Sequence, residues 1–273
     1  MKLENILNSK ESIVKDIRYK IIKTKEKEDC VVLYLNNNEK INVDVDTYFK
    51  FGISSLIGLD EELYEKLKYE EKLFMAYRGS LRKLSTKDFT IKQIKDYLVI
   101  KKDLDVDEAN ILLDKLVSYG LLDDDRYCLN RTSYLNKQLL STKQIKIKLT
   151  KEGVSKDLIE KYVINNSEEE YNKANKLAIK YSNSIRNKSL NATKQNILSK
   201  IVNLGYSYEA AKQSVDNLNL KSSNELELLK KEYLKAKKKY ESKYDNYDLR
   251  NHIYTYLINK GFRSEDIKTV MED

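Results

Sequence analysis

Along the first fifty residues, the hydrophobic and polar positions follow a strand-like pattern. The run 31–35 is β-branched and aromatic, a short Asn-rich stretch follows, and 40–45 then alternates polar and apolar side chains. This pattern predicts a β-hairpin. An earlier run, 17–22, alternates loosely and predicts a third strand. Because an isolated hairpin is marginally stable in water, we expect this small unit, residues 1–60, to pack against a neighbouring helix.

From about residue 60 onward, the apolar positions recur at helical spacing. Leu63, Leu67, Phe74 and Leu81 fall near the spacing of one helix face. The composition favours long helices, because the sequence has no Pro, only 7 Gly, and 34% charged residues. A hydrophobic fraction of 41% is sufficient for amphipathic helices and too high for a disordered chain. The chain beyond residue 60 is therefore predicted to be helical.

Three glycines mark a pattern that repeats in the helical part of the chain. Gly153, Gly205 and Gly261 each follow apolar residues eight and four positions earlier, and precede an acidic residue four positions later. Apolar residues four apart form one helix face, and a glycine at its end suits the left-handed conformation of a helix C-cap. Ser155 and Ser207 then suit the N-cap of a following helix. Each stretch predicts a helix, a tight turn and a second helix.

A fourth, weaker copy of this pattern precedes the other three. Asp103 stands where the glycine would be, and the four turns are separated by 50, 52 and 56 residues. Between copies there is room for one longer helix, and acidic residues at 123–125 and 168–170 suit the positive start of such helices. The stretch 222–244 is predicted to be the last of them. The repeating unit is thus three helices, one long and two short.

The predicted fold class is mainly α, with tandem three-helix repeats in an elongated, curved array behind a small N-terminal unit of two or three strands. Four repeats in series explain the length without one large core. The predicted units are 1–60 for the β-containing unit and, for the four repeats, 61–122, 123–166, 167–220 and 221–273.

Charge is spread unevenly along the chain. The net charge is +8, and residues 129–164 alone carry 8 basic and 3 acidic groups. Such a patch suits a phosphate backbone or an acidic protein surface, although a solvated helix face would have the same composition. The candidate contact residues lie in the second repeat and on the helix before it: Arg126, Arg131, Lys143, Lys146, Lys148, Lys151, Arg78 and Arg82.

Signals for catalysis are weak. The one histidine, His252, has no Cys, Asp or Ser constellation around it, and the glycines form no phosphate-binding loop. The acidic triplet at 123–125 suits a metal site, but helix capping explains it better. The many tyrosines suit base stacking, but at helical spacing core packing explains most of them. We therefore expect no catalytic residue, no metal and no cofactor.

The cysteines and the N-terminus bear on the compartment. Cys30 and Cys128 lie far apart, and two buried thiols in a reducing cytosol explain them better than a disulfide. The Met1 end carries no cationic start followed by an apolar run, and no stretch reaches the roughly 18 apolar residues that span a bilayer. A cytoplasmic, monomeric protein without membrane contact is expected.

Three stretches of sequence carry a resemblance to a known family. Residues 84–94 followed by 113–127, and then 145–154, resemble the RecX family of RecA regulators. The junction Gly120–Tyr127 (GLLDDDRY) is the most specific part. The family often has several arginines where this chain has Thr86–Phe89, and a glycine is common where this chain has Ser141. The first of these departures weakens the case for a basic face in the first repeat.

The resemblance implies a non-enzymatic protein that lies along the groove of a RecA–DNA filament. There it would modulate RecA in DNA repair and recombination, usually by inhibiting strand exchange and co-protease function. Many weak contacts on a repeating partner would add up through effective concentration. Two alternatives stay open: a helical-repeat protein that binds single-stranded or double-stranded nucleic acid directly, and a purely structural adaptor.

Overall fold

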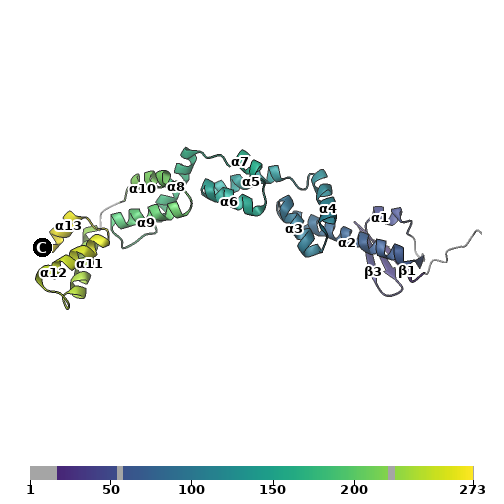
Figure 1. Ribbon diagram of the computed structural model, residues 1–273, viewed down its shortest axis with the longest axis horizontal. Helices are drawn as coiled ribbons and strands as arrows, with labels where there is room; N and C mark the ends of the chain where they lie inside the picture. Colours follow the sequence, from purple (N-terminus) through teal and green to yellow (C-terminus); the bar gives the residue numbers. More distant parts are fainter. Residues whose placement is uncertain (1–16, 54–57, 221–224, 273) are drawn as a thin grey trace, which may run out of the picture. The chain divides into compact units, whose positions relative to one another are not determined.

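The computed structural model describes residues 17–53, 58–220 and 225–272. The chain is mainly helical, with a small antiparallel sheet near its N-terminus, as the hydrophobic pattern predicted (Figure 1). It divides into two compact units, Met1–Asp124 and Asp125–Asp273. Each unit is described separately below.

The sheet of the first unit has four strands in the order β3-β2-β1-β4. The predicted hairpin is confirmed, and the predicted third strand begins two residues later than expected and runs further. The two-residue strand β4 was not predicted, because two residues carry no periodicity. The strands are β1 (Tyr19–Glu26), β2 (Val31–Leu35), β3 (Lys40–Val43) and β4 (Gly58–Leu59).

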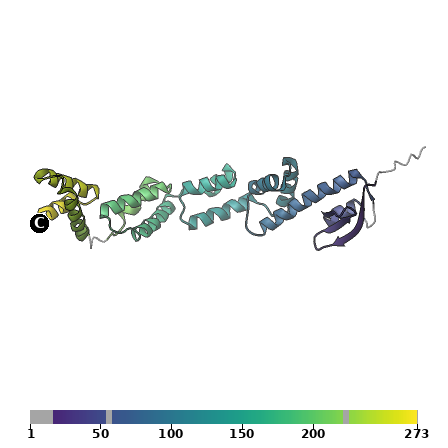
Figure 2. The ribbon, with the colours of Figure 1, turned by 90° about the horizontal axis from the view of Figure 1, so that it is seen from below.

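Helix α2 (Glu61–Leu84) covers one face of the sheet and continues beyond it toward the next helices (Figure 2). Asp60 caps its start by accepting from the Leu63 amide at 2.8 Å. The Tyr64 hydroxyl donates to Glu39 at 2.6 Å, which ties the helix to the turn between β2 and β3. The expectation that the strands lean on a helix is therefore confirmed. A short helix, α1 (Val45–Lys50), was not predicted.

The C-terminal half of α2 packs with α3 (Ile91–Lys102) and α4 (Val106–Ser118) around a second hydrophobic cluster. Both shorter helices begin with a capping box, in which the N-cap side chain and a residue three positions later exchange hydrogen bonds. Asp103 has φ 55° at the end of α3, so it adopts the left-handed conformation predicted for the residue in the place of glycine.

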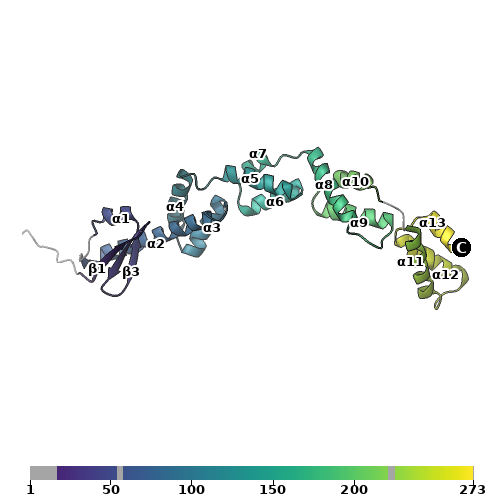
Figure 3. The same cartoon turned by 180° about the vertical axis from the view of Figure 1, so that it is seen from behind.

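The second unit contains nine helices among its described residues, in three consecutive groups (Figure 3). Each group packs around its own hydrophobic cluster. The grouping into repeats along the whole chain stays a prediction. The groups are α5 (Asp124–Lys137), α6 (Thr142–Glu152) and α7 (Lys156–Tyr162); α8 (Ser167–Ser182), α9 (Leu190–Asn203) and α10 (Tyr208–Asp216); and α11 (Glu225–Tyr240), α12 (Asn246–Asn259) and α13 (Ser264–Glu272).

The glycine turns have the geometry that the sequence predicted. Gly153, Gly205 and Gly261 have φ of 90°, 82° and 85°, all left-handed. Ser155 and Ser207 cap α7 and α10 by accepting from an amide three residues later. The helix predicted at 222–244 is shorter: α11 ends at Tyr240 in a turn, and Ser222 lies outside the described residues.

Two serines join neighbouring helix groups of the second unit in the same way. In the first joint, the buried Ser141 hydroxyl accepts from the Gln144 amide at 3.2 Å and donates to the Leu204 carbonyl at 2.7 Å. In the second joint, the buried Ser189 hydroxyl accepts from the Ala192 amide at 3.2 Å and donates to the Lys260 carbonyl at 2.7 Å. Each serine therefore caps one helix and satisfies a carbonyl at the end of another.

The first joint carries additional side-chain hydrogen bonds. The Tyr206 hydroxyl donates to the carbonyl of Leu139 at 2.7 Å, and Lys173 donates to the Leu140 carbonyl at 3.0 Å. Among the described residues, the second joint has one further contact between the groups, in which the Leu190 amide donates to the Glu225 side chain at 3.2 Å. Burial raises the pKa of the Tyr206 hydroxyl, which keeps it protonated as a donor.

Candidate partner-binding surfaces

Four lysines of α6 form an exposed basic face. Lys143, Lys146, Lys148 and Lys151 are solvent-exposed, whereas Ile145 and Leu149 on the same helix are buried. Within the described part of the chain, none of these four lysines forms an ion pair with a carboxylate. We call them the α6 basic face. Four unpaired cations on one short helix attract phosphates or carboxylates of a partner.

Arg131 has a structural contact that the sequence did not reveal. Its guanidinium donates to both carboxylate oxygens of Glu152, with distances of 2.5 and 3.1 Å, and Tyr127 donates to the same carboxylate at 3.0 Å. These bonds tie α5 to the end of α6 and raise the pKa of Arg131. Arg126 lies exposed in the first turn of α5.

Arg78 and Arg82 line a cleft of about 400 Å³ between α2 and α3. Arg78 is held by Asp29 at 2.8 Å, whereas Arg82 is exposed. Lys83 and Lys102 also line the cleft, with the rings of Phe89 and Tyr97. We call this the aromatic–basic cleft. Four cations beside two rings, without an acidic side chain in the lining, suit a phosphate with an adjacent base.

One glycine makes this cleft possible. A side chain on Gly79 would place its Cβ 2.5 Å from the Tyr97 hydroxyl and 2.9 Å from a side-chain carbon of Lys102. Glycine at this position of α2 therefore allows Tyr97 to approach the helix closely. The ring of Tyr97 in turn lies 5.3 Å from the ammonium group of Lys83.

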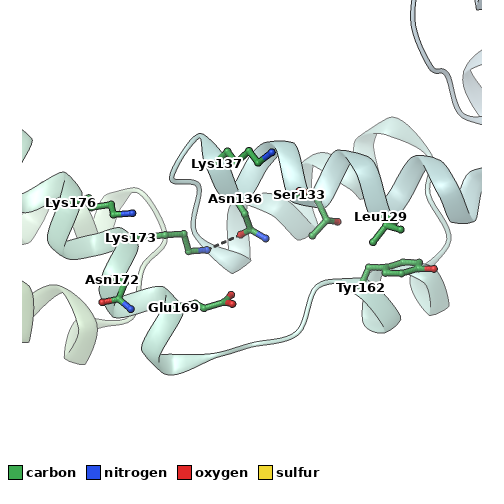
Figure 4. A pocket seen from close by; sticks show the side chains of 10 residues that line it. Leu129, Ser133, Asn136, Lys137, Tyr162, Glu169, Asn172, Lys173 and Lys176 are labelled. Carbon is green, nitrogen blue, oxygen red and sulfur yellow. Dashed lines mark hydrogen bonds between the residues drawn. The ribbon is translucent and has the colours of Figure 1, made fainter.

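A larger cavity, of about 500 Å³, lies between α5, the end of α7 and α8. Figure 4 shows Lys137, Lys173 and Lys176 around it, with Glu169 below and Leu129 and Tyr162 at the far end. We call this the lysine groove. Its lysines were missed as a group, because two of them belong to the helix group that follows the basic segment 129–164.

The remaining polar candidates have structural partners. In the acidic triplet, Asp124 accepts from the Ile91 amide at 2.9 Å, and Asp125 accepts from Lys161 and Tyr162. Burial raises the pKa of Asp124. Among the described residues, no cluster of three or more His, Cys, Asp or Glu side chains is arranged to hold a metal ion.

The histidine and the cysteines lie in ordinary packing environments. His252 stacks on the ring of Tyr244, with 3.9 Å between ring centroids. Cys30 and Cys128 are buried free thiols, as predicted, and burial raises the pKa of Cys30. No helix within the described ranges combines the length and apolar character needed to cross a bilayer.

Comparison with known proteins agrees with the resemblance found in the sequence. Residues 223–271 match the model of the third three-helix domain of RecX. The regulatory protein RecX of Streptococcus gordonii is 32% identical over 263 residues, which cover 93% of this chain and 99% of that relative. The chain belongs to the RecX family. The RecX protein of Streptococcus sanguinis is 29% identical over 262 residues, with the same coverage.

A crystal structure of a regulatory protein RecX has the same fold. It superposes with a TM-score of 0.58 at 21% identity, and covers 73% of this chain and 100% of the solved chain. The two Streptococcus relatives are named as regulatory proteins, which agrees with the expectation of a regulator. In this RecX family member, Ser141 is the residue that makes the first joint.

Proposed function

We propose that this protein binds the RecA–DNA filament and inhibits RecA strand exchange, ATP hydrolysis and co-protease activity. Membership of the RecX family carries this proposal, because the resemblance implies a RecA regulator. The α6 basic face supports it on physical grounds. Its four lysines lack acidic partners within the described chain, so they are available to the phosphates of filament DNA or to acidic residues of RecA.

The inhibitory function is tested with purified RecA on single-stranded DNA. Added at substoichiometric amounts, the protein is expected to lower DNA-stimulated ATP hydrolysis and strand exchange, and to pellet with the filaments. RecA filaments without added protein serve as the reference. If saturating protein leaves both activities unchanged and stays in the supernatant, the proposed function is wrong.

Charge reversal tests the part played by the α6 basic face. Replacing Lys143, Lys146 and Lys151 by Glu is expected to weaken pelleting with filaments by at least tenfold, because each reversal turns attraction into repulsion. The matched control replaces three exposed lysines outside all the surfaces described above with Glu: Lys180, Lys188 and Lys212. Equal activity of both variants would favour a purely structural adaptor.

Direct binding to nucleic acid is the second candidate function, and the aromatic–basic cleft favours it. A labelled single strand is titrated without RecA at several salt concentrations. Tight binding with a steep salt dependence, weakened by Arg82→Ala and Lys83→Ala, would support this second function. Weak binding that the two substitutions leave unchanged would exclude the cleft as a nucleic-acid site.

A further inference from the structure

The lysine groove has one feature that distinguishes it from the rest of the molecule. Thr132 lines it, is only 6% exposed, and its hydroxyl has no hydrogen-bond partner within the described chain. Among the described residues, this hydroxyl oxygen is the one buried side-chain polar atom without a hydrogen-bond partner. A buried hydroxyl without a partner costs free energy. The oxygen itself is closed off from solvent, but rotation of the Thr132 side chain about χ1 would bring it to the groove, where a ligand would supply the missing hydrogen bond.

The charge of the groove indicates the sign of the charge on its ligand. Lys173 is half-buried and donates to Asn136 and to the Leu140 carbonyl, both at 3.0 Å, but no carboxylate pairs with it in the described chain. Burial lowers the pKa of Lys173, and the nearby carboxylates of Glu170 and Glu169 offset this shift only in part. Lys137 and Lys176 lie exposed at the rim. Among the residues that line the groove, the three ammonium groups outnumber the single carboxylate, Glu169, so an anionic ligand is favoured.

One end of the groove is apolar. Leu129, which is 50% exposed, lies at one end beside Tyr162. A second hollow of about 320 Å³ shares Tyr162 and Lys173 with the groove and continues to Ile164, which is 73% exposed. Apolar side chains at one end of a basic hollow, and in the hollow that adjoins it, suit a ligand with apolar and acidic groups side by side.

We propose that the lysine groove binds an acidic, amphipathic segment of the protein partner. Its carboxylates would pair with Lys173 and the rim lysines, and an apolar side chain would pack on Leu129 and Tyr162. A bound carboxylate or backbone carbonyl would accept from the Thr132 hydroxyl. A volume of about 500 Å³ fits a few side chains of such a segment.

A nucleic-acid backbone fits the same groove less well. Phosphates follow one another along a strand and favour an open track of exposed cations, as on the α6 basic face. Here the central cation is half-buried, and the Glu169 carboxylate lines the same cavity and would repel a phosphate. A peptide can place single carboxylates between such groups.

This inference rests on the proposed function, because the segment would belong to RecA. The test uses the full chain and RecA filaments. One variant combines Lys137→Glu and Lys176→Glu, and the control variant combines Lys180→Glu and Lys212→Glu. Both variants change the net charge equally. The groove variant is expected to pellet with filaments at least tenfold more weakly than the control, with both binding free DNA equally.

The outcomes separate the two proposals. If the unmodified protein does not pellet with filaments, the proposed function fails, and this inference fails with it. If it pellets and both variants behave alike, only the groove inference fails. If the groove variant loses binding to free DNA more than the control does, the groove is a nucleic-acid site and the inference is overturned.

Photo-crosslinking identifies the ligand directly. A benzoylphenylalanine in place of Leu129 lies in the groove, and one in place of Ile179, equally exposed on α8 outside it, is the control. We expect the first to crosslink to a RecA segment with at least two acidic residues near the crosslinked position, found by mass spectrometry. Crosslinks to DNA, or to RecA segments without acidic residues, would overturn the inference.

Discussion

The two joints of the second unit use the same serine contact but differ in what surrounds it. In the first joint, Tyr206 and Lys173 add hydrogen bonds to carbonyls beside Ser141. In the second joint, Ser189 is supported by one bond between Leu190 and Glu225. The first joint also borders the lysine groove, through Asn136 and Lys173. Two hydrogen bonds thus connect the helix groups at the second joint, and the additional bonds of the first joint lie beside the proposed binding groove.

Replacing the glycine of each joint should have the largest effect. Gly261→Ala would place a Cβ 2.7 Å from the Ser189 hydroxyl and 3.0 Å from the Ala192 backbone nitrogen, whereas in Gly205→Ala the nearest contact is 2.9 Å to the Ser141 hydroxyl. Alanine is also strained in the left-handed conformation of these positions. We therefore expect the free energy of unfolding to fall by about 3 kcal/mol in Gly261→Ala and by about 2 kcal/mol in Gly205→Ala. Urea denaturation measures both, and equal losses would contradict this difference between the joints.

Removing the serines should come next. Ser141→Ala and Ser189→Ala each lose an N-cap and leave a carbonyl without its donor, so each should cost about 2 kcal/mol. Ser155→Ala, which loses a cap only, should cost about 1 kcal/mol. We also expect faster amide hydrogen exchange throughout the second joint in Ser189→Ala, but not throughout the first joint in Ser141→Ala, where other bonds remain.

The Tyr206 hydroxyl should contribute less. Tyr206→Phe removes its bond to Leu139 and should cost about 1 kcal/mol near neutral pH. Since burial raises the pKa of Tyr206 above its usual 10.0, its contribution is complete below pH 10 and falls as the pH rises above that value. Denaturation at pH 8 and pH 11 should therefore show a smaller alkaline loss in the variant than in the unmodified protein. The same loss in both proteins would show that Tyr206 does not titrate differently on folding.

Removing the Thr132 hydroxyl should give a gain in stability of a size similar to the loss in Tyr206→Phe. Thr132→Val removes the unpartnered hydroxyl beside the first joint and should stabilise the free protein by about 1 kcal/mol, while weakening filament binding. Thermal denaturation and pelleting measure the two effects. Thr150→Val is the control, because its exposed hydroxyl already donates to the Lys146 carbonyl at 2.9 Å, and it should show no gain. A loss of stability in Thr132→Val would contradict the role given to this hydroxyl.

Much of the fold follows from local pattern. The hairpin, the helix that begins after Asp60, and the left-handed turns at Asp103 and the three glycines were predicted, because strand alternation, capping residues and positive φ are local properties. The elements that were missed, α1 and β4, are too short for periodicity to mark. Their position depends on packing against the sheet, which a single sequence does not reveal.

The surfaces followed from the sequence only in part. The α6 basic face appeared in the sequence as an excess of basic residues. The arginine pair in α2 was recognised because its two members are four residues apart. The bond of Arg131 to Glu152 and the groove around Lys173 depend on residues brought together by folding. The joint of Ser141 with Leu204 spans 63 residues, and that of Ser189 with Lys260 spans 71. No local pattern marks such partners.

The two serine joints span different lengths of sequence, and this difference has a consequence for how such chains evolve. The same hydroxyl-to-carbonyl bond forms although the intervening segments differ in length by several residues, so insertions between helices need not disturb the connection. A duplicated gene segment that keeps one Ser at a helix start and one Gly after a helix end already encodes a compatible attachment point. Family members with different numbers of helix groups can then arise without redesign of the existing interfaces.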